Sequence, residues 1–470
     1  MNALTKVAIL LILALLAAPA LAGQGPDQEP ADVLTLEKAV QLALEHSLQI
    51  ESSLYEKDAA KWGKWEAVSG WLPKVRFDSS VTRMDEDTVD RLNIYTDSTR
   101  ELADLYGFDP DEIEPAAYDN TYSSSLSVIQ PVTNGGAEVG AILAARALHA
   151  QKRHAYADAR SKTVLDTKTA YFNVLKARAL LEVANESHRL AQETLRMFDA
   201  RYSVGEVSRA DVLRWEAQAA KAENALLEAG NGLEVAKITL ANVLGIDLDV
   251  RYELERLPEK ADLDSFREVL RDADVDRELN AAQMAERFQE HPGIQRMESV
   301  VDAAGGNRVI AWSSVLPRLN LAYTYSWETD DDPDLDGQES WTLSLALQMP
   351  LFQSLTGAFK IAQARKNYKL AKVGLKSYER GFMQQAYAYR LGLRSAYLRI
   401  LAAEKERKFA DENLKITMSK HELGMASNLQ LVDAQLAFNQ ARSSYIDAMS
   451  DFYVAAANWE YLTIGEKNKE

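Results

Sequence analysis

A chain of 470 residues with 70 acidic and 53 basic side chains carries a formal net charge of −17 at pH 7. This balance argues against nucleic acid as a partner, because a phosphate backbone selects a basic surface. The chain has no cysteine, which excludes disulfide bonds and a lipid-modified N-terminal cysteine.

Residues 1–22 are typical of a secretory signal peptide. Lys6 gives a positive start, the apolar run VAILLILALLAA follows, and Ala20-Leu21-Ala22 supplies a small-x-small cleavage site. The run is shorter than the roughly 20 residues that a spanning helix needs, so an uncleaved anchor is the weaker alternative. No later stretch is apolar enough to span a bilayer as a helix, so we expect an exported protein that enters a membrane, if at all, by another structure.

Residues 35–70 predict one or two amphipathic helices, because apolar side chains recur at helical spacing. The stripe consists of Leu36, Ala39, Val40, Ala43 and Leu44. We expect this helical region to end at Trp71-Leu72-Pro73.

The apolar period then changes to two in four segments, 74–85, 121–131, 318–327 and 340–349. Each places apolar side chains on one face and small or polar ones on the other; the clearest face carries Trp341, Leu343, Leu345, Leu347 and Met349. Aliphatic residues flanked by aromatic ones are typical of lipid-facing barrel strands, and roughly 9 to 11 residues cross a bilayer when tilted. A soluble hairpin with one buried face remains the alternative for either pair.

Acidic loops separate the strands of each pair, at 86–120 and 328–339, and the first contains a predicted short helix near 98–106. The Asp-rich composition suggests calcium, but the regular ligand spacing and closing Glu of an EF-hand are missing. We therefore expect solvated loops and no metal site.

Two proline-free tracts follow the strand pairs, 132–257 and 351 to the C-terminus, and they predict long helical arms. Gly205 lies 74 residues after Pro131, and Gly424 lies the same distance after Pro350. Helices of that length measure roughly 100 Å, at 1.5 Å per residue. They carry heptad repeats, which predict supercoiled packing: Ala170, Ala177, Ala184 and Ala191, then Ala434, Ala441, Ala448 and Ala455, with Leu431, Phe438, Tyr445, Phe452 and Trp459 alongside.

The arms end in two related stretches, RYSVGEVSRADVL at 201–213 and KHELGMASNLQLV at 420–432. Each has a glycine suited to a left-handed helix end, followed by a serine with Asp or Gln three residues later, the spacing of a capping box. Each stretch is therefore predicted to be the tip of a helical hairpin, and the chain to be an internal duplication.

Shorter return helices are expected at 208–243 and 427–462, and helices of similar length at 35–70 and 278–312. A return helix and an opening helix stacked end to end would match one long arm, giving four columns in each half. The predicted organisation is a signal peptide (1–22), a first repeat (23–245), an equatorial linker of small helices or a short strand (246–277), a second repeat (278–462) and a C-terminal tail (463–470).

Several motifs, taken together, resemble the TolC-like outer-membrane efflux protein family over essentially the whole mature chain. They are the opening LTLEKAVQLALEHSLQIE, the Leu-Pro of WLPKVRF and VLPRLNL, the strand-to-helix junction QPVTNGGAEVGAILAAR with its degraded copy MPLFQSLTGAFKIAQAR, and Val204-Gly205 with Leu423-Gly424 at the tips.

The resemblance implies an α+β membrane protein in which a homotrimer combines four transmembrane strands per chain into a twelve-stranded barrel. A long antiparallel coiled-coil α-helical barrel would continue it through the periplasm. The residues agree, because four strands are too few to close a barrel and open edges are not tolerated in lipid. The implied role is the passive exit duct of a tripartite efflux or type I secretion system, docked by a periplasmic adaptor and coupled to an inner-membrane pump.

The resemblance also assigns site residues. The adaptor-docking tips would be Val204, Gly205, Ser208, Leu423, Gly424 and Ser427. Family aspartates that close the periplasmic entrance fall on Gln430 and Asp433, so one acid is retained, and Asp211 is the first-half counterpart of Gln430. A ring of three Asp433 carboxylates would repel one another and attract cations. Asp211 has an equally good claim as a capping residue.

No catalytic or cofactor-binding constellation is present in the sequence. There is no Gly-Lys-Ser/Thr phosphate loop and no Gly-x-Ser-x-Gly elbow, and none of the adjacent Glu and His pairs has the second histidine four residues away that a zinc protease helix requires. We therefore expect a protein that is not an enzyme and has no cofactor. A periplasmic coiled-coil scaffold and a stand-alone outer-membrane porin remain as alternative functions.

Overall fold

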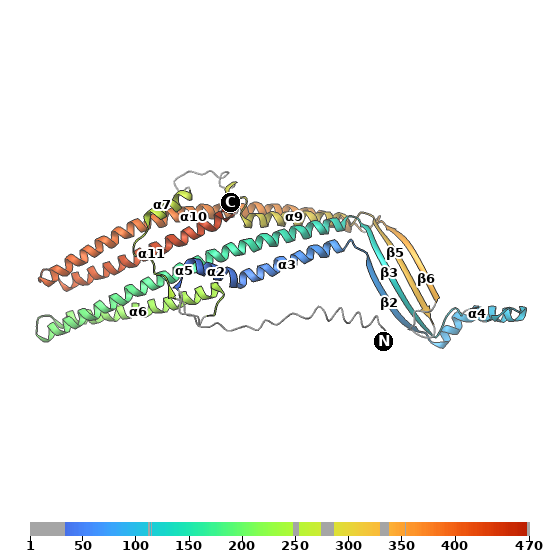
Figure 1. Cartoon of the computed structure of the whole chain (residues 1–470), viewed down its shortest axis with the longest axis horizontal. Coiled ribbons are helices and arrows are strands. Elements are labelled where there is room, and N and C mark those ends of the chain that lie inside the picture. Colours follow the sequence, from blue (N-terminus) through green and yellow to red (C-terminus); the bar gives the residue numbers. More distant parts are fainter. Residues whose placement is uncertain are drawn as a thin grey trace.

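The computed structural model describes residues 33–110, 113, 115–247, 253–273, 286–329, 338–352 and 354–467. The expected signal peptide lies outside these residues, as do most of the loop 328–339 and parts of the linker 246–277. The described chain is elongated: a β-sheet at one end continues into a layer of long helices (Figure 1). Among the described helices, none is both long enough and apolar enough to cross a bilayer.

The sheet consists of β2 (Lys74–Arg83), β3 (Asn120–Asn134), β5 (Arg318–Thr329) and β6 (Gln338–Gln348). Their order is β2-β3-β5-β6, and every neighbouring pair is antiparallel. The four predicted strands are confirmed. In the described sheet, β2 and β6 each keep one edge without a hydrogen-bonded neighbour.

The strand register places all four predicted apolar faces on the same side of the sheet. Phe77 lies opposite Leu126, Leu126 opposite Tyr325, and Tyr325 opposite Trp341. Directly opposed residues point to the same side of a sheet, so these side chains form one continuous apolar surface. It is uncovered in the single chain, with Trp341 66% and Phe77 57% exposed. A soluble hairpin would bury such a face.

Two helices of 67 residues each form the predicted arms, α5 (Ala137–Ser203) and α10 (Thr356–Glu422). At 1.5 Å per residue each is about 100 Å long. They are followed by the return helices α6 (Arg209–Leu244) and α11 (Asn428–Lys467). The equal lengths of the arms confirm the duplicated hairpin.

Shorter helices precede each strand pair. The predicted region 35–70 forms two helices, α2 (Leu36–His46) and α3 (Leu48–Ser69). The second opening helix, α9, spans Pro292–Trp312 and has proline in its first turn, where no intrahelical donor is lost. Part of its predicted range, 278–285, lies outside the described residues.

The long helices lie side by side in one layer, in which α5 has neighbours on both sides (Figure 1). Near the sheet α5 packs between α3 and α9, and towards the tips it packs between α6 and α11, while α10 packs against α9 and α11. The predicted end-to-end stacking is therefore correct. The predicted number of columns is wrong: each half supplies two, because one arm spans the full height and the two shorter helices share the other column.

The helices α5 and α9 approach each other closely at two glycines. A Cβ atom on Gly306 would lie 2.5 Å from the backbone nitrogen of Ala144, and one on Gly140 would lie 2.7 Å from that of Ile310. Both contacts involve backbone atoms, so the two helices touch directly just below the sheet.

The predicted heptads lie at buried seams, as Ala191, Ala434 and Ala441 are at most 4% exposed. A row of polar contacts also joins the two halves along α5 and α11. It comprises Lys168–Glu460 at 2.5 Å, Lys176–Asp447 at 2.8 Å, Arg442–Glu186 at 2.6 Å and Asn439–Ser187 at 2.9 Å. Partly exposed ion pairs stabilise by only about 0–1 kcal/mol each, so this row fixes the register more than it holds the halves together.

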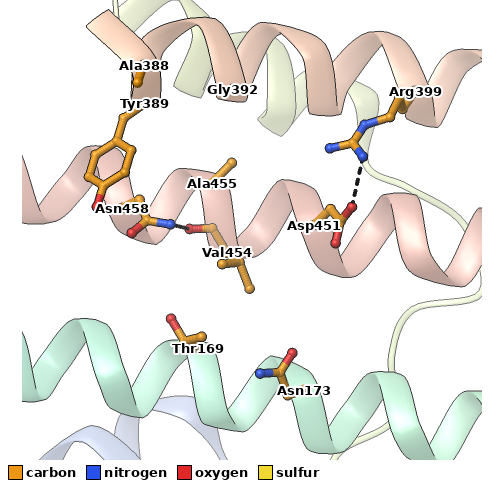
Figure 2. Close-up of a pocket in the computed structure, with 10 residues that line it drawn as sticks. All are labelled: Thr169, Asn173, Ala388, Tyr389, Gly392, Arg399, Asp451, Val454, Ala455 and Asn458. Carbon is orange, nitrogen blue, oxygen red and sulfur yellow. Dashed lines mark hydrogen bonds and ion pairs between the residues drawn. The ribbon is translucent and has the colours of Figure 1, made fainter. Parts of the chain in front are cut away.

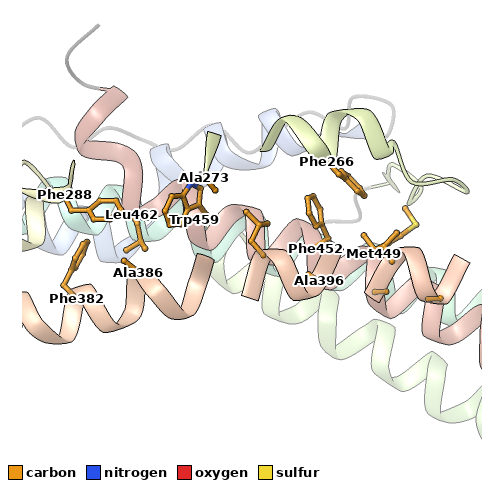
Figure 3. Close-up of a cluster of buried hydrophobic side chains, with 14 of the residues drawn as sticks. Phe266, Ala273, Phe288, Phe382, Ala386, Ala396, Met449, Phe452, Trp459 and Leu462 are labelled. Atoms are coloured by element: carbon orange, nitrogen blue, oxygen red, sulfur yellow. The ribbon is translucent and has the colours of Figure 1, made fainter. Parts of the chain in front are cut away.

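The described residues of the predicted linker 246–277 contain a short strand and a helix. β4 (Glu253–Leu254) pairs in parallel with β1 (Val33–Leu34), and α7 (Leu263–Asp272) covers the second hairpin. Phe266 of α7 stacks on Phe452 of α11 with ring centroids 4.0 Å apart. Figure 3 shows this contact within the largest buried apolar cluster, which α7, α10 and α11 share.

The loop between β2 and β3 holds a longer helix than predicted. The expected helix near 98–106 is α4, which spans Glu86–Tyr106. It begins where the Asp85 side chain accepts a hydrogen bond of 3.1 Å from the Thr88 backbone and ends at Gly107, with φ of 81°. The helix begins earlier than predicted because Glu86 and Asp87 lie in its first turn, where acidic side chains interact favourably with the helix N-terminus.

The two strand-to-helix junctions share a left-handed backbone but differ in residue type. The first uses Gly135 and Gly136, with φ of 69° and 79°. The second uses Ser354 and Leu355, with φ of 48° and 63°. A residue with a Cβ pays roughly 1–2 kcal/mol for this conformation, so the second junction is strained where the first is relaxed.

Candidate functional site at the helical hairpin tips

Both arms end in the same hydrogen-bonded turn. Gly205 has φ of 81° and donates to Tyr202 O at 3.0 Å, while Glu206 N donates to Arg201 O at 2.9 Å. This is the Schellman motif, which satisfies the last carbonyls of a helix and needs a left-handed residue. At the other tip, where Gly424 has φ of 74°, the equivalent bonds measure 3.0 and 2.8 Å.

Both return helices begin with the predicted capping box. Ser208 N donates to Asp211 Oδ2 and Asp211 N donates to Ser208 Oγ, each at 3.3 Å. At the second tip Ser427 N donates to Gln430 Oε1 at 2.8 Å, and Gln430 N donates to Ser427 Oγ at 3.3 Å. Asp211 and Gln430 therefore have a structural role as caps.

The tips present apolar side chains to solvent. Val204 is 70% exposed, and Leu423 and Met425 are 75% and 74% exposed. Four of the predicted docking residues, the two glycines and two serines, shape the turn. Val204 and Leu423 are the two predicted docking residues with large exposed apolar side chains.

An apolar cluster joins the two hairpins just behind their tips. Phe198 of α5 and Trp215 of α6 are at most 1% exposed, with ring centroids 5.7 Å apart. They pack together with Leu414, Leu431, Val432 and Ala434 from the second hairpin. The two tips of one chain are therefore fixed to each other.

A side-chain bridge crosses between the tips and was not predicted. Asn428 Oδ1 lies 2.7 Å from His421 Nε2, and the Asn428 side chain also hydrogen-bonds the Asp211 carboxylate of the first tip. Since a carboxylate only accepts, the Asn428 amide donates to Asp211 and its oxygen accepts from His421.

The Asp211 carboxylate is held in its charged form. Ser208 Oγ donates to it at 2.6 Å, and hydrogen bonds from Ser208 and then Asn428 lower its pKa below the ordinary value. Bonds to the charged form act in this direction. Sequence patterns did not indicate the bridge, because Asn428 follows the cap of one helix and says nothing about a partner in the other half.

The predicted gate residues occupy different positions at the tip. Asp433 and Gln430 are exposed on α11, whereas Asp211 is half-buried between the two hairpins. Asp211 is connected to the second tip by its hydrogen bond with the Asn428 side chain. Asp433 lies on the exposed surface of the first turns of α11.

A pocket of about 330 Å³ lies farther up, between α5, α10 and α11 (Figure 2). Thr169 and Asn173 of α5 face Tyr389 of α10 across it, and Arg399 and Asp451 pair within its wall at 3.1 Å. Arg399 and Asp451 neutralise each other, so the wall of the pocket carries no unpaired charge.

The sequence is similar to those of known outer membrane proteins. The chain is 23% identical to the probable efflux pump outer membrane protein TtgC of Pseudomonas putida over 321 residues, which cover 65% of this chain and 63% of that protein. The matched region thus spans somewhat less than two thirds of the relative's length.

Solved structures share the fold at lower identity. The CmeC outer membrane channel of Campylobacter jejuni superposes with a TM-score of 0.76 at 16% identity, covering 92% of this chain and 85% of that one. The outer membrane protein VceC of Vibrio cholerae gives a TM-score of 0.73 at 16% identity, with 91% and 96% covered. The predicted TolC-like fold is confirmed.

The family model described as outer membrane efflux protein matches residues 39–246 and 285–460, one segment in each half of the duplication. These segments contain the four strands, both long arms and both tips. The chain therefore belongs to the outer membrane efflux protein family.

Proposed function

We propose that the chain is one third of a trimeric outer-membrane duct, the passive exit of a tripartite efflux or type I secretion system. The observation that carries the proposal is a sheet with one uncovered apolar face and two unpaired edges. In lipid every backbone donor and acceptor must be paired, so an open four-stranded sheet would be unstable there. Pairing β6 of one copy with β2 of the next closes twelve strands and removes both edges.

Fractionation tests this proposal against a soluble periplasmic scaffold. The mature protein is expected in the outer membrane, extractable only with detergent, and to migrate as a trimer on gels loaded without heating. Recovery of the mature protein as a soluble monomer without detergent would refute the proposed duct and favour the periplasmic scaffold.

The tips would dock a periplasmic adaptor, which connects the duct to an inner-membrane pump. Val204 and Leu423 supply exposed apolar area, and the turns at Gly205 and Gly424 hold them at the far end of arms about 100 Å long. The duct would perform no chemistry, bind no cofactor and take its energy from the pump. The same assembly places the sheet against outer-membrane lipid and the helices in the periplasm.

The entrance would be narrowed at the tips by Asp433, and Gln430 and Asp211 are the other two predicted gate residues. Three Asp433 carboxylates around a pore would repel one another and favour cations. Asp433→Ala is expected to raise single-channel conductance in planar bilayers, with Glu223→Ala, an exposed acid farther up α6, as the control. Full conductance of the wild-type protein would count against the gate and favour a stand-alone porin.

A further inference from the structure

The helix α4 projects beyond the end of the sheet that lies away from the tips (Figure 1). One of its faces is anchored by its own chain. Asn93 exchanges two hydrogen bonds of 2.8 Å with the Ala117 backbone, Arg100 Nε donates to Ile113 O at 2.7 Å, and Val89 is only 8% exposed. With caps at both ends, α4 is a well-defined helix and not an irregular loop.

A second face of α4 is apolar and uncovered. Its residues recur at alternating steps of three and four: Leu92, Tyr95, Thr99, Leu102 and Tyr106. Four of them are large, with exposures of 51%, 84%, 53% and 73% for Leu92, Tyr95, Leu102 and Tyr106. A single exposed apolar residue is ordinary, but this spacing is that of a coiled-coil seam, in which every position meets a neighbouring helix.

Five of the six acidic residues of α4 lie across the helix from this stripe. At 100° per residue, Glu86, Asp90, Asp97, Glu101 and Asp104 fall on the opposite side. An acidic face of this kind is repelled by an anionic membrane surface. The charge distribution therefore favours a protein helix over lipid as the occupant of the stripe.

The position of α4 in the chain indicates which helix would cover the stripe. It begins three residues after β2 ends at Arg83, and β2 is the edge strand at which the next copy would join the sheet. Threefold symmetry brings three α4 helices to the same end of the barrel in parallel, with identical stripes.

We propose that the stripe of α4 packs against the α4 helices of the two other copies, forming a three-helix cap over the outer mouth of the duct. This inference rests on the trimer proposed above. Leu92, Thr99 and Tyr106 occupy one set of seam positions, and Tyr95 and Leu102 occupy the other. The acidic faces point outward into solvent.

The absence of cysteine from the chain makes a direct test simple. In a parallel bundle each seam residue meets its own copy, so Leu102→Cys, oxidised in outer membranes, is expected to give disulfide-linked dimers on denaturing gels. One cysteine in each of three chains can link two of them. The matched control is Glu101→Cys, the adjacent residue on the acidic face, which is expected to remain monomeric. Tyr95→Cys, at a second seam position, is expected to behave as Leu102→Cys.

The outcomes separate the cap from the trimer itself. Trimers on unheated gels together with no more crosslinking of Leu102→Cys and Tyr95→Cys than of Glu101→Cys would overturn the cap and leave the duct intact. Crosslinking to a foreign protein would also overturn it. Loss of the trimer in the wild-type protein would overturn both proposals.

Discussion

Replacing Gly306 with alanine should force α5 and α9 apart, whereas the same change at Gly305 should not. The methyl group added at Gly306 would lie 2.5 Å from Ala144 N and 2.8 Å from Ala144 Cα. At Gly305 the nearest atom is Tyr368 Cε2, at 3.9 Å, which is an ordinary contact. The two positions are adjacent in one helix, so they form a matched pair.

The expected energies have opposite signs. Alanine in place of an interior helical glycine is favourable by about 0.5–1 kcal/mol, and Gly305→Ala should show this gain. Gly306→Ala receives the same gain but must widen a backbone contact by about 1 Å, and overpacking of this kind costs about 1–3 kcal/mol or more because a backbone cannot change rotamer. We expect Gly306→Ala to be clearly less stable than wild type.

The measurement is the apparent melting temperature of the detergent-purified protein, followed by helical circular dichroism and by trimer survival on gels. We expect Gly305→Ala to have the highest melting temperature, wild type an intermediate one and Gly306→Ala the lowest. If Gly306→Ala melts at or above wild type, α5 and α9 do not pack as closely as described.

Three further predictions concern the apolar face of the sheet, the capping residue Asp211 at the first tip, and Leu423 at the second tip. Leu345→Arg, on the apolar face, should reduce the yield of trimer, because arginine facing lipid costs roughly 2–4 kcal/mol at mid-depth; Ser344→Arg, on the opposite face, should assemble, and equal yields would show that the face does not meet lipid. The pKa of Asp211 is lowered, so the stability from its hydrogen bonds is present above about pH 4 and lost as pH falls through the folded value. The difference in tip hydrogen exchange between wild type and Asp211→Asn should therefore shrink as the pH is lowered below about 4; a difference that does not change with pH would contradict the assignment. Leu423→Glu should abolish export without reducing trimer, while Leu227→Glu, 61% exposed on α6, should not; export by Leu423→Glu would show that docking does not use this tip.

The strands, arms and tips were predictable because each depends on local pattern. Alternation of period two set the strand faces, and the register then aligned Phe77, Leu126, Tyr325 and Trp341 as expected. The arms followed from two proline-free tracts in which the distance from the preceding proline to the tip glycine is 74 residues. The turns followed from a glycine and a cap, which a sequence shows directly.

The contacts between the halves were not predictable in the same way. The Asn428 bridge to Asp211 and the cluster around Phe198 and Trp215 join residues whose proximity is set by helix packing over the whole length of the arms. The glycine contact at Gly306 likewise depends on where α9 crosses α5. No local pattern specifies a crossing point, and the bridge and the cluster are the contacts that hold the two tips together.

The left-handed corner at Ser354 and Leu355 makes the two halves mechanically unequal. The first long arm leaves the sheet through glycines that adopt their angles freely, whereas the second leaves through residues held in an unfavourable conformation. Leu355 is 60% exposed, so burial of its side chain does not offset the strain. When heat or a pulling force begins to detach a long helix from the sheet, we expect the N-terminal end of α10 to loosen before the N-terminal end of α5.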